Sequence, residues 1–279
     1  MAGQSDQPPR RRGRAPTSPQ KRRARAERIL DAAVKLIERW GYDKTTIDDI
    51  AREAGVAKGT IYLHWKTRED LFMTVIMREA LVVIESLQKY ITENADSFAF
   101  HTFFPYAFLL YQQRPLVKAL LTNDASLLGS VAQHDYLQDN SIARRKVLFA
   151  HAILEQMQAE GLLRSDLSLR RLEYMLSAIF IGYLTLDPLW PAEERLPLEQ
   201  QAQDLGEAIR LSLESQQLPP PERRRRLAHA ANEHIASFVA AIRSYLEQYI
   251  PGISGGNTYD STDSSQRPDE VLRSQPRHS

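Results

Sequence analysis

The sequence contains no cysteine, so disulfides, thiolate metal sites and redox sensing through thiols are excluded. It also lacks any run of about eighteen apolar residues, the length that a membrane-spanning helix needs. No apolar region follows the basic N-terminal stretch, as one would in a signal peptide. We therefore expect a cytoplasmic protein that does not enter a membrane.

Catalytic motifs are missing as well. There is no glycine-rich phosphate loop, no nucleophile elbow and no pair of histidines with a carboxylate between them. The seven histidines are scattered, and without cysteine they form no convincing metal-ligand set. We expect no enzyme, no metal and no cofactor.

What the sequence does contain is an uneven distribution of charge. Residues 1–28 hold nine arginines and lysines against two acidic residues, a net charge of +7, and the rest of the chain carries −6. The proline-rich composition of residues 1–20 indicates a disordered basic arm. Its charge favours contact with a polyanion such as DNA. The alternative is a solvated tail that only helps solubility.

Residues 46–65 have the pattern of two short helices joined by a sharp turn. Apolar side chains at i, i+3, i+4 and i+7 form one face of the first helix, at Ile47, Ile50, Ala51 and Ala54. Thr46 and Asp49 fit a capping box, and Gly55 fits the left-handed residue that ends a helix.

In the second helix Ile61 and Trp65 face inward, which leaves Lys58, Thr60, Tyr62 and His64 outside. Two helices crossed in this way can place the second in a DNA major groove. Helix pairs around a glycine also serve many unrelated functions.

The flanking segments extend the motif. An apolar stripe with helical spacing precedes it, at Ile29, Ala33, Leu36, Ile37 and Trp40. Thr67 and Asp70 fit the capped start of a further helix. The sequence thus predicts a three-helix unit from which a fourth helix leaves.

Residues 29–72 closely resemble the TetR family of bacterial transcriptional regulators. The matching segments are the apolar stripe, the turn from Gly41 to Thr46, Ile50–Val56, Gly59–Trp65 and Thr67–Phe72. Residues 160–168 are similar to the family's junction between its last core helix and its dimerisation helices. Ala57 departs from the family's Ser or Thr, and the loss of this cap costs the recognition helix about 1 kcal/mol.

The resemblance implies a homodimeric repressor that binds a palindromic operator in double-stranded DNA. It places DNA contacts on the second helix and beside it, at Lys44, Thr46, Lys58, Gly59, Thr60, Tyr62, His64 and Arg68. The family's usual behaviour also implies release by a small-molecule effector. Control by a protein partner, or by no effector, stays open.

No alternating strand pattern occurs after residue 66, so we predict an all-α fold. The expected order is the arm, a helix-turn-helix DNA-binding domain at 21–66, a helical ligand-binding and dimerisation domain at 67–216, a linker with an extra C-terminal helix at 217–250, and a disordered tail at 251–279.

Two helices of the expected body are candidates for the dimer interface. Apolar side chains cover most of the circumference of helix 169–186, so it must be buried on more than one side. The resemblance implies that this helix pairs with helix 197–216 and with their copies in a second subunit.

The C-terminal helix is longer than the family usually carries. Its apolar face acquires heptad-like spacing from Ile235 onward, which suits an extra dimer contact or a lid on the body. Arg223–Arg226 at its start could touch DNA, or form a solvated face.

The resemblance also implies an effector pocket inside the body, for which the aromatic stretch 98–111 and helix 169–186 are candidate walls. The candidate ligand-binding residues are His101, Phe103, Phe104, Tyr106, Tyr111, His151, Tyr174 and Tyr183. An apolar pocket with few polar groups suits a hydrophobic small molecule. Aromatic side chains at helical spacing are also common as plain core.

Overall fold

The protein is all-α, as its sequence predicts. The computed structural model describes residues 18–130 and 143–250, and within these ranges the helices are joined by turns, without a strand. The helices of the first half are α1 (Pro19–Trp40), α2 (Ile47–Glu53), α3 (Lys58–Tyr62), α4 (Arg68–Glu93), η1 (Ala95–Ser97), α5 (Phe100–Gln112), α6 (Pro115–Thr122) and α7 (Ala125–Leu128). The second half contains α9 (Ala143–Ala159), α10 (Leu169–Thr185), η3 (Asp187–Leu189), η4 (Ala192–Glu194), α11 (Leu198–Leu213) and α12 (Pro221–Glu247).

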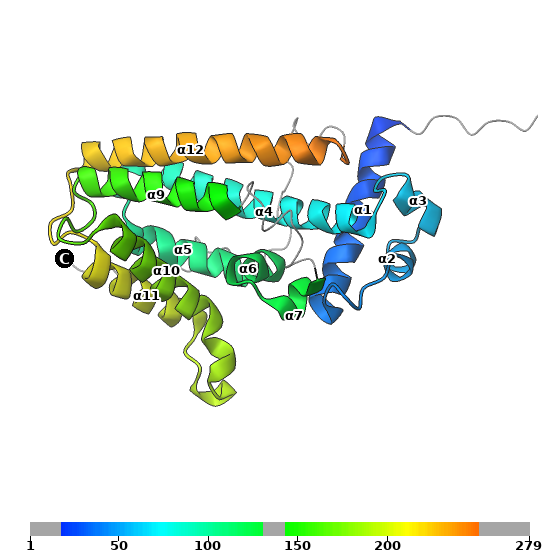
Figure 1. The fold of residues 1–279 in the computed structure, drawn as a ribbon, viewed down its shortest axis with the longest axis horizontal. Helices are drawn as coiled ribbons and strands as arrows, with labels where there is room; N and C mark the ends of the chain where they lie inside the picture. Colours follow the sequence, from blue (N-terminus) through cyan, green and yellow to red (C-terminus); the bar gives the residue numbers. More distant parts are fainter. Residues whose placement is uncertain (1–17, 131–142, 251–279) are drawn as a thin grey trace, which may run out of the picture.

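Helices α1–α3 form a unit at one end of the molecule, called here the N-terminal unit (Figure 1). Helix α4 leaves this unit and runs into the body, which consists of α5–α11 (Figure 1). Helix α12 lies along α4 and α9 on the opposite side from α10 and α11 (Figure 1). Among the described residues, no helix is both long and apolar enough to cross a membrane.

The starts of two helices follow the predicted capping chemistry. Thr46 Oγ1 accepts a hydrogen bond from the Asp49 amide at 3.2 Å, and the Asp49 carboxylate accepts one from the Thr46 amide at 3.3 Å. Thr67 and Asp70 repeat the arrangement at the start of α4, with both distances 3.0 Å. Each box satisfies two helix-end amides, so both helices begin where the sequence indicates.

Helix α1 begins two residues inside the segment expected as a disordered arm. Pro19 occupies the first helical turn, where its missing N–H is no loss, and Ser18 caps the helix by accepting the Lys21 amide at 3.4 Å. Pro19 and Gln20 are therefore helical. The rest of that arm, residues 1–17, lies outside the described residues, as does the predicted tail 251–279.

The N-terminal unit packs its predicted apolar stripe with one exception. Ile29, Ala33, Leu36 and Ile37 are buried, whereas Trp40 is 41% exposed, so its assignment to the core was wrong. Trp40 is the last residue of α1, and Gly41 then turns the chain away with a φ of +78°. Its ring instead lies beneath the Arg39 guanidinium at 5.7 Å.

In the body, α5 lies between α4 on one side and α10 and α11 on the other. Gly206 of α11 meets α5 so closely that a Cβ atom there would stand 2.6 Å from the His101 carbonyl oxygen. Buried Glu214, just after α11, accepts the His101 amide at 3.0 Å and thereby caps the start of α5. The side chain of His101 also bonds to this carboxylate, at 2.7 Å.

Candidate DNA-binding interface

Helices α2 and α3 cross through a turn that the sequence dictates. Gly55 has a φ of +63°, the left-handed backbone that glycine adopts without a Cβ penalty. Ala51 is buried where α3 packs against α2, and Ile61 and Trp65 anchor α3 to the core with no exposed surface. Ala57 makes no side-chain cap, as its departure from the family pattern predicts.

The outer face of α3 carries the predicted DNA-reading residues. Lys58 and Gly59 are exposed, Thr60 is half-buried, and Tyr62 is 47% exposed. Leu63, which the sequence analysis did not single out, is 74% exposed. Gly59 and Leu63 are four residues apart and lie on the side of the helix opposite Ile61. The only sequence signal for Leu63 was its offset from the inward residues Ile61 and Trp65.

Several predicted contacts already have partners within the chain. Lys58 Nζ lies 2.8 Å from Asp48 of α2, and this carboxylate raises the pKa of the lysine. The Arg68 guanidinium stacks at 3.8 Å on the Tyr42 ring and donates to the Tyr42 carbonyl. Thr46 caps α2, while Lys44 is exposed beside it.

His64 is half-buried at the base of α3, against Trp65 with the ring centres 5.2 Å apart. Burial, followed by the positive charges of Arg22 and Arg25, lowers the pKa of His64. A hydrogen bond to the main-chain carbonyl of Tyr249 acts in the opposite direction. The imidazole is therefore neutral at pH 7, unlike a cationic phosphate ligand.

A polar chain fastens the helix pair to α4. The Trp65 indole donates to Thr74 Oγ1 at 2.9 Å, and Thr74 donates to the Asp70 carbonyl at 2.7 Å. Both Trp65 and Thr74 are fully buried, so these bonds form without competition from water. The orientation of the helix pair is thus tied to the first turns of α4.

A buried arginine makes a second connection between the N-terminal unit and α4. Arg78 of α4 is 4% exposed, and its guanidinium lies 2.6 Å from Asp31 and 3.3 Å from Glu27, both of α1. It also pairs at 3.0 Å with Glu79, whose other oxygen pairs at 3.0 Å with Arg114. Because Arg114 immediately precedes α6, this network links α1, α4 and the body.

The predicted ligand-binding aromatic residues separate into two groups. Phe104 and Tyr111 face α10, with ring centres 5.1 and 5.9 Å from Phe180, and Tyr183 of α10 contacts Phe108 at 6.5 Å. Phe103 and Tyr106 instead face α4, where both contact the ring of Tyr90, at 6.2 and 4.3 Å.

The remaining candidates lie elsewhere. His101 is held by Glu214 at the start of α5. His151 is exposed on α9 and pairs with Glu173 at 2.7 Å, and Tyr174 is 79% exposed on α10. His151 and Tyr174 therefore do not join the aromatic residues between α5 and α10.

Comparison with known proteins agrees with this arrangement. Residues 29–75 match the family model described as bacterial regulatory proteins, tetR family. The fatty acid metabolism regulator protein of Bacillus subtilis is 37% identical over 76 residues, which are 27% of this chain and 39% of that protein. The transcriptional repressor KstR2 of Mycolicibacterium smegmatis is 26% identical over 155 residues, 55% of this chain and 74% of that protein.

A crystal structure of a gamma-butyrolactone receptor aligns with 77% of this chain and 99% of its own, at 17% identity and a TM-score of 0.46.

The crossed helices α2 and α3, with the exposed outer face of α3, form a helix-turn-helix within the residues that this family model covers. Residues 29–75 therefore form a domain of the tetR family of bacterial regulatory proteins.

Proposed function

We propose that the protein is a dimeric repressor that binds a two-fold symmetric operator through α3 and is released by a hydrophobic small molecule. The observation that carries the DNA-binding part is the outer face of α3, where exposed residues surround the side-chain-free Gly59. A glycine at the centre of this face allows the helix backbone to approach the floor of the major groove.

The residues of this face have distinct roles in the proposal. Tyr62 and Leu63 supply apolar surface that suits the methyl group of thymine, and the Thr60 hydroxyl can bond to base edges. Lys44, Thr46 and Lys58 lie where they can contact phosphates, which fix the position of the helix. Lys58 then exchanges its bond to Asp48 for one to a phosphate.

Replacing Tyr62 or Lys58 with alanine is expected to weaken specific binding by about 1–3 kcal/mol each. In the Lys58 variant, the slope of the logarithm of the binding constant against the logarithm of the salt concentration should become less steep by about one unit, because one phosphate contact is lost. Mobility shift at several salt concentrations measures both effects. Lys89→Ala, an exposed lysine at the far end of α4, is the matched control. Wild-type affinity in both α3 variants would contradict this interface.

The dimer part rests on the exposed face of α10. Tyr174, Ser177, Ala178 and Gly182 recur at helical spacing and are all exposed, although this helix is mostly apolar. Leu189 beyond its end is 79% exposed. Exposed apolar surface beside a row of small residues is typical of a protein interface. A second copy of the chain would bring two α3 helices to two half-sites about one helical turn apart.

The effector part rests on the aromatic residues between α5 and α10. Phe104, Phe180 and Tyr183 supply apolar walls, and the Tyr111 hydroxyl is a polar group in apolar surroundings. Burial raises the pKa of Tyr111 to about 12, so the group is a neutral hydrogen-bond donor. Helix α5 also contacts α4 through Tyr106, which gives a ligand here a route to the N-terminal unit.

Tyr111→Phe is expected to remove the response to an effector while leaving operator affinity unchanged, because only the hydroxyl is lost. A thermal-shift screen of hydrophobic small molecules finds compounds that stabilise the wild type. Such a compound should stabilise the variant less and release it less from DNA. Equal responses would place the pocket elsewhere. A screen in which no compound releases the wild type would favour control by a protein partner, or none.

A further inference from the structure

Helix α12 lies antiparallel to α4, and polar pairs set their register. Arg225 near its start bonds to Asp96 at 2.5 Å, and Asn232 donates to Thr92 at 2.9 Å. Further along, Arg243 donates to Glu85 at 3.1 Å. As the numbers rise along α12 they fall along α4, so α12 starts at the far end of the body and runs towards the N-terminal unit (Figure 1).

The start of α12 is consequently remote from α3. Arg225 faces Asp96, while Arg223 and Arg226 lie 3.9 and 3.6 Å from Glu160 at the end of α9. These arginines are ion-paired at the end of the body opposite to α2 and α3 (Figure 1). They fasten the helix to the body rather than meet DNA bound at α3.

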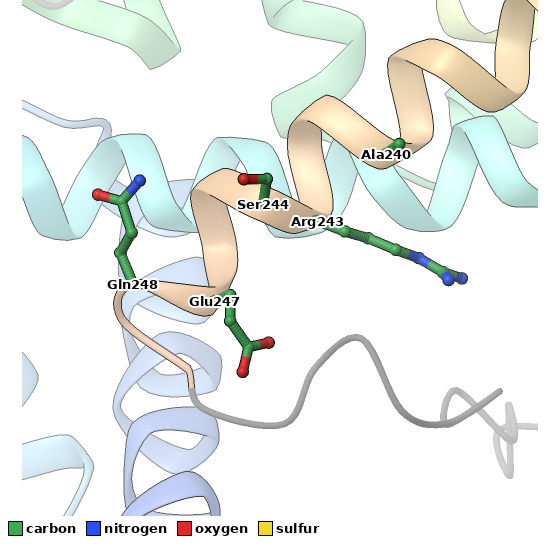
Figure 2. Close-up of a pocket in the computed structure, with 5 residues that line it drawn as sticks. All are labelled: Ala240, Arg243, Ser244, Glu247 and Gln248. Carbon is green, nitrogen blue, oxygen red and sulfur yellow. The ribbon is translucent and has the colours of Figure 1, made fainter.

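The end of α12 reaches the N-terminal unit. Leu246 and Ile250 have no exposed surface, although they lie at the last turn of the helix and just past it. The main-chain carbonyl of Tyr249 accepts the hydrogen bond from His64, two residues after the end of α3. The other face of these turns is open, and it presents Ala240, Arg243, Ser244, Glu247 and Gln248 around a shallow hollow (Figure 2).

We propose that the last turn of α12 is a latch that fixes the orientation of the N-terminal unit on the body, and that His64 is a positioning residue within it. The inference rests on the proposed DNA-binding function. Besides the α4 junction, the unit meets the body at α7, where the Tyr42 amide donates to the Leu127 carbonyl at 3.0 Å. The latch adds a support beside α3 itself.

The latch assigns His64 a role other than phosphate contact. Its ring lies against Trp65 and bonds to the Tyr249 carbonyl just past α12, and the positive charges of Arg22 and Arg25 of α1 act on it. A neutral imidazole that donates to a carbonyl holds two elements together. Because α12 keeps register with the far half of α4, a bend of α4 that tilts the N-terminal unit against the body changes the fit at His64 and alters the direction of α3.

The test compares Ile250→Ala, just past the end of α12, with Ile235→Ala in the middle of that helix. Both substitutions remove the same atoms from a buried isoleucine, and Ile235 is 9% exposed. Both variants should lower the thermal stability. Only Ile250→Ala should speed amide hydrogen exchange in residues 47–65 and weaken operator binding, by about fivefold or more. Equal exchange rates and equal affinities in the two variants would overturn the latch.

Variants of His64 give a second readout that does not depend on Ile250. Gln can still donate to the Tyr249 carbonyl, so His64→Gln should keep near-wild-type exchange at residues 47–65, whereas His64→Ala should not. If His64 instead pairs with a phosphate, the affinity advantage of the wild type over His64→Gln grows as the pH falls from 7.5 to 5.5. Under the latch the two proteins bind alike at pH 7.5 and the wild type gains no advantage as the pH falls, because protonation of His64 near Arg22 and Arg25 is unfavourable.

Hydrogen exchange needs no DNA, so the two hypotheses fail separately. Faster exchange in Ile250→Ala together with no specific DNA binding by the wild type would reject the proposed function and leave the latch standing. Specific DNA binding by the wild type, with equal exchange rates and equal affinities in Ile250→Ala and Ile235→Ala, would do the reverse.

Discussion

Gly182→Arg is expected to turn the protein into a monomer and to weaken operator binding. The loss of affinity should be roughly 100-fold or more, because a dimer binds DNA through two linked subunits and a monomer through only one. Gly182 is exposed in α10, and apart from its chain neighbours and the backbone of its own helix no atom lies within 4 Å of a Cβ built there. An arginine therefore fits the isolated subunit. Replacing a glycine inside a helix also favours the helix by up to about 1 kcal/mol. Any loss of binding must then come from the blocked interface.

Analytical ultracentrifugation and mobility shift measure this effect together. Gly182→Ala is the control, since it gains the same helix preference with little added bulk. It should remain dimeric and bind as the wild type does. A Gly182→Arg protein that is still a dimer with unchanged affinity would show that the subunits meet on another face.

Arg78→Ala should destabilise the fold by about 3–5 kcal/mol, the range for removing one partner of a buried ion pair. The substitution leaves Glu27, Asp31 and Glu79 without the cation that lies within 3.3 Å of each. Glu79 is itself only 6% exposed, so its charge stays in a poorly solvated position beside Arg114. The cost therefore includes an uncompensated carboxylate as well as lost bonds.

Chemical denaturation measures this loss of stability. Arg52→Ala removes an ion pair with Asp49 whose arginine side chain is 79% exposed, and it should cost at most about 1 kcal/mol. If the two variants have the same unfolding free energy, Arg78 contributes no more than a surface charge, and the network does not hold α1 on α4.

The sequence predicted elements whose determinants are local. The Thr46 and Thr67 capping boxes, the left-handed Gly55 and the uncapped Ala57 depend on residues within a few positions of each other, and all four occur as expected. Trp40 was misplaced because a helical stripe does not show where the partner helices stop. Here the next residue, Gly41, is buried against the Ser126 carbonyl of α7, whereas Trp40 stays 41% exposed.

Long-range partners could not be predicted. Periodicity alone identified the outward face of α3, but not that Asp48 holds Lys58 or that Tyr42 holds Arg68. The Arg78 network joins residues that are 47 and 51 positions apart, with no periodic signal in the sequence. The end of α12 meets His64 across still more of the chain, so His64 looked like any outward residue.

The central claim is that α3 reads a specific DNA sequence, and selection from a pool of randomised duplexes tests it most directly. The wild type should enrich a two-fold symmetric site with half-sites about one helical turn apart. Tyr62→Ala and Leu63→Ala should relax the preference at the same base pairs in both half-sites, and replacing thymine there by uracil, which lacks the methyl group, should mimic the loss. Enrichment of no sequence by the wild type, or of an identical sequence with equal affinity by all three proteins, would contradict the account.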